Sequence, residues 1–285
     1  MPLFPPNIAA MKEKRDFAGL LMILKGKDVR ARSAAAQALG ELGARSAVPA
    51  IAELLLSPDS KLTEKTTAAE ALGSIKDDSA VDALVQETAH SRARERGTID
   101  AAIDATDRKY SLNYYVNRIA ADEYTLRSAI AIALGRIGGE RGIHALFEML
   151  ATETGQMGSS VQKDAKTAIS TVLESDGQRF VPLLIEELKE KSVEVRQFAA
   201  YCLGDYGSEE AVNALIATTY DEQEDFDVRA SAMRSLANIG DRRAIPYLED
   251  LLHSGNRAIV RDAQAALDGI RQKSPLRSDD NSTAQ

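Results

Sequence analysis

The stretch ALGELG at residues 38–43 decides the fold, because it recurs along the chain. It returns as ALGSIK at 71–76, ALGRIG at 133–138, CLGDYG at 202–207 and SLANIG at 235–240. Self-similarity at a period of roughly 20 to 50 residues is the signature of repeat architectures. The chain therefore predicts an array of similar units rather than one globular core.

Each copy can be anchored on its central aliphatic residue. With the same frame carried to two further copies, the anchors are Leu39, Leu72, Leu134, Ile169, Leu203, Leu236 and Leu267. The step from Leu72 to Leu134 is about twice the others, and Ile103 stands at its midpoint in the same frame. We therefore predict eight units, the third of them a hairpin with helices over about 79–90 and 94–106.

The residues around each anchor follow a helical period. The residue just before the anchor is always small: Ala38, Ala71, Ala102, Ala133, Ala168, Cys202, Ser235 and Ala266. The residue four before the anchor is Ala in six copies and Ile in the other two. Small residues at this spacing let two helix backbones approach closely, while the anchor fills the space beside them. The recurring motif therefore predicts a helix that is packed on its neighbours.

A second, shorter apolar stretch precedes each of these helices, as in AVPAIAELL at 47–55. Pro49, Pro182 and Pro246 stand where an opening helical turn loses little from a missing N–H. We expect the helices to end at Gly43, Gly138, Gly207 and Gly240. Each unit is thus predicted to be a helical hairpin, and stacked hairpins form an all-α solenoid.

Composition narrows the class of function. A chain that is 44% hydrophobic but only 5% aromatic relies on Ala, Leu, Ile and Val, as closely packed helices do. The formal charge of −8 argues against nucleic acid as a partner. One cysteine cannot form an internal disulfide, and no apolar run suggests a signal peptide or a membrane span. We expect a cytoplasmic protein that does not bind membranes.

The repeats resemble the HEAT-repeat family, and more narrowly the short HEAT-like repeats of phycobilisome lyases. The resemblance is carried by AVPAIAELL, VRASAMRSLANIGD and RAIPYLEDLL. It implies a right-handed α-solenoid of about eight hairpins over residues 16–272, and it is specific for fold rather than function. We expect residues 1–15 to cap the first hairpin and the polar segment 273–285 to be a disordered tail.

A basic residue stands seven positions before the anchor in six copies: Arg32, Lys65, Arg96, Arg127, Arg196 and Arg229. Such a stripe could bind an anion. In HEAT-like repeats, however, this position commonly belongs to an Asp/Arg ladder between units, and candidate acids are Asp28, Asp59, Glu190 and Asp225. We therefore predict a structural ladder of ion pairs. Cys202 lies in the column of small residues, so we expect it to pack rather than to act as a nucleophile.

The sequence offers no evident catalytic constellation. None of His90, His144 and His253 is followed by Glu, whereas a di-iron HEAT enzyme of the deoxyhypusine hydroxylase kind needs recurring His-Glu dipeptides. A HEAT-like DNA glycosylase is disfavoured by the negative charge and the lack of Trp. We predict no catalytic residue, no metal ion and no cofactor.

The candidate site is the face of the second helices that does not enter the core, which lines the concave side of a solenoid. Two residues before and after the anchors, this face holds Gln37, Glu41, Glu70 and Ser74 in the first units. Its unusual members come later in the chain, and we predict that they bind the partner: Ile132, Arg136, Phe198, Tyr201, Asp205, Arg234 and Asn238. Exposed aromatics with Arg are typical of binding hot spots, although Phe198 could equally pack between units.

These observations predict a non-catalytic scaffold or adaptor that holds another protein on its concave face. The resemblance implies an alternative from the enzyme class, a bilin (tetrapyrrole) lyase or chromophore chaperone of the phycobilisome-lyase type. Such a protein would hold the tetrapyrrole, its only small-molecule ligand, with aromatic and basic groups of a groove. The acceptor cysteine would then be on the client protein.

Overall fold

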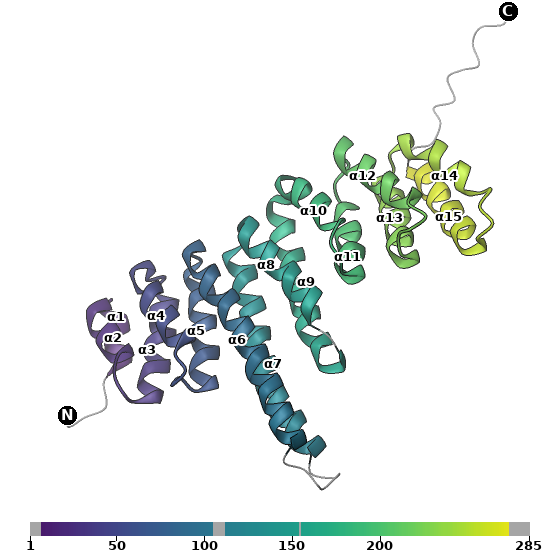
Figure 1. Ribbon diagram of the computed structural model, residues 1–285. Helices are drawn as coiled ribbons and strands as arrows, with labels where there is room; N and C mark the ends of the chain where they lie inside the picture. The colour runs from purple at the N-terminus through teal and green to yellow at the C-terminus, as the bar shows by residue number, and fades with distance from the viewer. Residues whose placement is uncertain (1–6, 105–111, 154, 274–285) are drawn as a thin grey trace, which may run out of the picture. The chain divides into compact units, whose positions relative to one another are not determined.

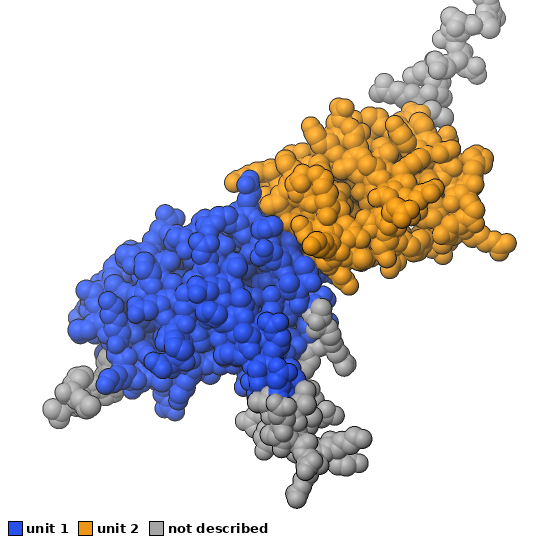
Figure 2. Space-filling model, in the orientation of Figure 1, with its two compact units in different colours: residues 1–172 blue, residues 173–285 orange. Residues whose placement is uncertain are grey.

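The computed structural model describes the backbone of residues 7–104, 112–153 and 155–273, and the side chains of these residues except 101–104, 112–120 and 155–157. The described residues form α-helices joined by turns and short 3-10 helices, and none of them lies in a strand. The chain divides into two compact units, Met1–Val172 and Leu173–Gln285 (Figure 2). The predicted all-α solenoid is confirmed.

The first unit contains the helices of the first four hairpins, preceded by a short helix. They are α1 (Ile8–Glu13), α2 (Phe17–Leu24), α3 (Val29–Glu41), α4 (Val48–Leu56), α5 (Leu62–Ile75), α6 (Val81–Asp104), α7 (Leu112–Ile137), α8 (Gly139–Thr152) and α9 (Gly155–Asp176), the last of which ends in the second unit. The second helices α3, α5 and α7 pack side by side (Figure 1). The short α1 contacts α2 and α3, where the sequence predicts a cap.

The second unit contains three further hairpins. Their helices are α10 (Val181–Glu187), α11 (Val193–Leu203), α12 (Glu209–Tyr220), α13 (Phe226–Ile239), α14 (Ile245–Leu251) and α15 (Arg257–Lys273). Here too the second helices form a series, since α11 packs on α13 and α13 on α15. Residues 274–285 of the expected disordered tail lie outside the described part of the chain.

The predicted anchors form the core. The side chain of Ile103 lies outside the described residues, and the other seven of the eight are at most 1% exposed: Leu39, Leu72, Leu134, Ile169, Leu203, Leu236 and Leu267. The small residues allow the expected close approach, because the glycine after one anchor faces the small residue of the next copy. A Cβ on Gly73, for example, would lie 2.6 Å from the Cα of Ala133. Burial of the aliphatic anchors and this close backbone packing hold the helices together.

Local signals set the helix ends. Asp28 and Asp225 are the N-caps of α3 and α13, where each carboxylate accepts a backbone N–H that the helix leaves unpaired. Gly43, Gly138 and Gly240 follow helix ends as predicted, and each has a positive φ that glycine adopts without strain. The prediction for Gly207 is wrong, because its φ is not positive and α11 already ends at Leu203 with Gly204 as its cap.

The predicted hairpin of the third unit is also wrong. One continuous helix, α6, runs through both expected helices and contains Ile103, which is therefore no separate anchor. The expected turn has no proline, and Gly97 alone costs a helix about 1 kcal/mol, which packing can offset. The chain turns back only after Asp104 and forms the 26-residue α7. The described helices thus form seven hairpins, and α6 with α7 is the longest.

Candidate functional site

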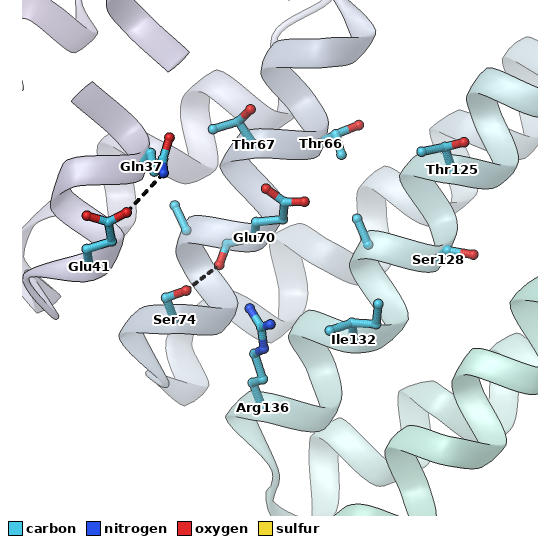
Figure 3. Close-up of a pocket in the computed structure, with 12 residues that line it drawn as sticks. Gln37, Glu41, Thr66, Thr67, Glu70, Ser74, Thr125, Ser128, Ile132 and Arg136 are labelled. Carbon is cyan, nitrogen blue, oxygen red and sulfur yellow. Dashed lines mark hydrogen bonds between the residues drawn. The ribbon is translucent and has the colours of Figure 1, made fainter. Parts of the chain in front are cut away.

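A groove in the first unit lies on the outward faces of three second helices (Figure 3). Its volume is about 520 Å³. The lining residues come from α3 (Gln37, Glu41), α5 (Thr66, Thr67, Glu70, Ala71, Ser74) and α7 (Thr125, Ser128, Ala129, Ile132, Arg136). We call this site the α3–α5–α7 groove.

Helical periodicity places these side chains together. On α7, Thr125, Ser128, Ile132 and Arg136 follow one another at intervals of three or four residues, so they share one face. The anchor Leu134 on the opposite face is fully buried, which directs the groove face outward. Ile132 is 44% exposed, an unusual position for a large aliphatic side chain. The sequence thus predicts Ile132 and Arg136 on one surface, and the structure brings both to the groove.

Most hydroxyl groups of the groove bond to their own helices. Thr66, Thr67, Ser74 and Thr125 each donate to the backbone carbonyl oxygen four residues earlier, at 2.8–3.0 Å. A hydroxyl that donates in this way keeps its oxygen lone pairs as acceptors. Sequence reasoning missed Thr66, Thr67, Thr125 and Ser128 because it considered only two columns beside the anchor. Extending the period by one further turn would have found Thr66, Thr67 and Ser128, and a second turn would have found Thr125.

The charged groups of the groove differ in their surroundings. Glu41 is paired, since it accepts from Lys12 of α1 and from Nε2 of Gln37, the latter at 2.9 Å. The hydrogen bond from Lys12 is the main reason that the pKa of Glu41 is lowered. Within the described part of the chain, neither the Glu70 carboxylate nor the Arg136 guanidinium has a hydrogen-bond or ion-pair partner. Figure 3 shows both side chains at the groove, on α5 and α7.

The other predicted site residues lie in the second unit, on α11 and α13, apart from Asp205, which follows the end of α11. The rings of Phe198 and Tyr201 are stacked, with centroids 5.9 Å apart and planes inclined by 16°. Tyr201 is 63% exposed, whereas Phe198 is half-buried. The pair therefore presents an aromatic surface of which Tyr201 is the outer part.

Polar contacts link α11, α13 and α15 near this pair. Asn238 donates to the carbonyl of Gly204 at 2.9 Å and to the carboxylate of Asp205 at 3.2 Å. Lys273 of α15 donates in turn to the side-chain oxygen of Asn238 at 3.0 Å. The exposed Arg234 donates to the backbone of Ala230 and to Ser231 on its own helix. The structure thus brings Asp205 and Asn238 together, and the hydrogen bonds of Asn238 also join α13 to the end of α11 and to α15.

The predicted ladder of ion pairs is confirmed for four of the six basic residues, Arg32, Lys65, Arg127 and Arg196, whereas Arg229 donates to the backbone carbonyl of Thr219. Cations of one helix pair with glutamates of other helices or of the loops beside them, as in Arg32–Glu64 at 2.7 Å, Lys65–Glu87 at 3.1 Å and Arg196–Glu224 at 2.7 Å. The expected acids are wrong, because glutamates other than Glu190 form these pairs, and Glu190 accepts from Arg196 through its backbone carbonyl oxygen. Asp28 and Asp225 serve instead as N-caps. The four paired cations are therefore not free to bind an anion.

The ladder is densest where α6 and α7 meet. Arg127 is 1% exposed and lies 2.8 Å from Glu95 and 2.9 Å from Glu153, while Arg94 binds Glu123 at 2.8 Å. The guanidinium of Arg127 also lies over the ring of Tyr124, 4.4 Å from its centroid. Burial, together with the hydrogen bond to Glu95, raises the pKa of Tyr124 to about 12. These buried charges fasten the long hairpin.

The described residues offer no metal site and no membrane-spanning helix. They contain no group of three His, Cys, Asp or Glu side chains that could hold a metal ion. Cys202 is 3% exposed, in agreement with its predicted packing role. Among the described helices, none is both long enough and apolar enough to cross a membrane.

The stacked helical pairs define an α-helical repeat protein. The model of the HEAT repeats matches residues 17–103 and 181–268, together more than half of the chain. The chain belongs to the HEAT-repeat family. The model of the PBS lyase HEAT-like repeat matches residues 126–152, which supports the resemblance to repeats of the phycobilisome-lyase type.

Individual relatives point in two directions. The phycocyanobilin lyase subunit alpha of Picosynechococcus sp. is 38% identical over 91 residues, which are 30% of this chain and 33% of that protein. The chain thus spans about a third of the length of the lyase subunits it matches. Deoxyhypusine hydroxylase-B of Oryza sativa is 24% identical over 92% of this chain and 80% of that protein.

Similar solved structures include the complex of CpcE and CpcF of phycocyanin lyase from Nostoc sp. The identity is 23%, the TM-score is 0.38, and the match covers 92% of this chain and 85% of that one.

Proposed function

We propose that this protein is a non-catalytic interaction module that holds a partner protein on the outward face of its second helices. The observation that carries the proposal is the α3–α5–α7 groove, which gathers an exposed Ile132 and two charges without a partner in the described chain, Glu70 and Arg136. Membership of the HEAT-repeat family agrees with this role, because stacked repeats present extended binding surfaces.

The stacked pair Phe198–Tyr201 is a second candidate contact, located in the second unit. Large aromatic side chains provide much of the binding energy of protein interfaces. Tyr201 is 63% exposed and so contributes little to the core. Removal of its ring should therefore affect binding more than folding.

Affinity capture from the native host tests the proposal. The wild-type chain and two double variants, Ile132→Ser with Arg136→Ala and Tyr201→Ala with Arg234→Glu, are compared for the proteins that they retain. A hot-spot truncation costs about 2 kcal/mol or more in binding, whereas exposed substitutions change folding by about 0.5 kcal/mol or less. We expect a retained protein to be lost from at least one double variant while thermal stability stays nearly unchanged.

The control is Glu186→Ala, an exposed substitution on the first helix α10. It should retain the partner as the wild type does. Retention of the same proteins by the wild type and by both double variants would contradict the proposal.

A second candidate function is a bilin lyase or chromophore chaperone. The match to phycocyanobilin lyase subunits favours it, and the stacked aromatic pair could lie against a planar pigment. Purified protein mixed with phycocyanobilin should then show a shifted absorption band that Tyr201→Ala reduces. An unchanged spectrum would remove this candidate. The likeness to deoxyhypusine hydroxylase supports no third candidate, because no histidine of this chain is directly followed by a glutamate.

A further inference from the structure

The α3–α5–α7 groove presents mainly hydrogen-bond acceptors. Four of its hydroxyl groups, from Thr66, Thr67, Ser74 and Thr125, already donate to their own helices, so their free lone pairs face a ligand as acceptors. The side-chain N–H that Gln37 directs to Glu41 leaves its carbonyl oxygen available as well. A ligand that is rich in donors would satisfy this surface.

The open negative charge of the groove is Glu70. Glu41 is already compensated by Lys12 and Gln37, so it attracts a further cation less strongly. Glu70 is exposed and has no partner in the described residues, and the groove lining contains one cation, Arg136, against these two carboxylates. Charge complementarity therefore favours a cationic group at Glu70.

An apolar strip lies beside this charge. Ile132 is 44% exposed, and the methyl groups of Ala71 and Ala129 belong to the same lining. The side chains of Lys and Arg combine a cationic head with an alkyl stem that packs on such a surface. A small inorganic cation would leave the exposed Ile132 uncovered, so a basic side chain fits better.

We propose, on the basis of the function proposed above, that the groove binds a Lys- or Arg-bearing segment of the partner protein. The cationic head binds Glu70 and the threonine oxygens, and the alkyl stem lies on Ile132. Arg136 donates to a carbonyl or carboxylate oxygen of the same segment. Negative charge on the segment at the Glu70 position is disfavoured by repulsion.

The test uses the full chain with isotope-labelled isoleucine methyl groups and three short capped peptides of one sequence, Gly-Ser-Leu-X-Leu-Ser-Gly. The central X is arginine, its neutral isostere citrulline, or glutamate. We expect the arginine peptide to shift the Ile132 methyl signal. Because charge-assisted hydrogen bonds are lost, the citrulline peptide should bind about tenfold more weakly. The glutamate peptide should bind more weakly still.

Two carboxylates of the same lining provide a matched pair of variants. Glu70→Gln should weaken binding of the arginine peptide about tenfold and leave binding of the citrulline peptide nearly unchanged. Glu41→Gln should change either affinity by about twofold or less, because Lys12 already neutralises Glu41. Thermal unfolding of each variant confirms that it is folded.

Equal affinity for arginine and citrulline, no binding of the arginine peptide, or equal effects of Glu70→Gln and Glu41→Gln would overturn the inference. These outcomes are distinct from failure of the proposed function. If the captured partner still depends on Ile132 and Arg136, the interaction module stands and only the basic ligand is wrong.

Discussion

At the scale of single residues, glycine and alanine set the distance between helices. A glycine follows the anchor in the motifs at 38–43, 71–76, 133–138 and 202–207, and each of these glycines lies against the small residue of the next copy. The sequence predicts the small column correctly in seven copies, where its periodicity is visible and the residues are buried, whereas Ala102 belongs to the third unit, which is not a separate hairpin. It does not reveal that the glycine is the other half of the contact, since that requires the neighbouring helix.

Gly73→Ala should destabilise the protein. Its new Cβ would lie 2.6 Å from the Cα of Ala133. Because this is a backbone atom, it could move only if the whole helix α7 shifted. The overpacking costs about 1–3 kcal/mol and outweighs the gain of about 1 kcal/mol in helix propensity. The control is Gly97→Ala in α6, where a Cβ would meet nothing within 4 Å and should stabilise by about 0.5–1 kcal/mol. Urea denaturation measures both, and a stabilised Gly73→Ala would refute the packing argument.

Substitutions of Cys202 test whether the column of small residues before the anchors tolerates a larger side chain. Cys202→Ala should keep partner capture and lower the free energy of unfolding by about 1–2 kcal/mol at most, because a small residue still fills the position. Cys202→Leu should cost more, about 1–3 kcal/mol, by overpacking. Thermal unfolding compares the two variants. A stable Ala variant without partner capture would show that the thiol has a functional role.

At the scale of elements, the long hairpin of α6 and α7 is the main departure from the sequence prediction. A residue in the correct frame, Ile103, suggests a separate helix, but the frame says nothing about where the chain turns. The turn is decided by the absence of a helix stop near 90–94 and by ion pairs that engage Arg92, Arg94 and Glu95 along α6. Such pairs join residues up to 61 positions apart, so local sequence cannot reveal them.

Arg127→Met should strongly destabilise this hairpin. The substitution would remove a cation that is 1% exposed and lies within 3 Å of both Glu95 and Glu153, and Glu153 would keep only Arg92, at 3.0 Å. Breaking a buried ion pair in this way costs about 3–5 kcal/mol. Arg261→Met, in the exposed pair Arg261–Asp262, should cost about 1 kcal/mol or less. Similar losses for the two variants in chemical denaturation would show that the network contributes no special stability.

At the scale of the whole molecule, the sequence repeat predicts the fold of the chain but not the chemistry of its surface. The periodicity predicts the helical array and the faces that remain outside the core, including Ile132 and Arg136. It does not predict which outward side chains already have a hydrogen-bond or ion-pair partner within the chain. Glu41 follows its anchor by two residues on α3 and Glu70 precedes its anchor by two residues on α5, and both line the groove. In the described chain only Glu41 forms an ion pair, with a lysine of α1.

The overall charge leads to a prediction about nucleic acid. The formal charge is −8, and the repeated guanidinium groups of Arg32, Arg127 and Arg196 are paired with glutamates, so they are not available to phosphates. Nonspecific binding of DNA-binding proteins depends on such free cations and gives dissociation constants of about 1–100 µM at physiological salt. We expect a labelled short DNA duplex to show no change in fluorescence anisotropy with up to about 100 µM protein at about 150 mM salt. A dissociation constant below about 10 µM that rises steeply with salt would mean that the arginines of the ladder leave their glutamates and bind phosphates. The α3–α5–α7 groove would then not be the principal binding surface.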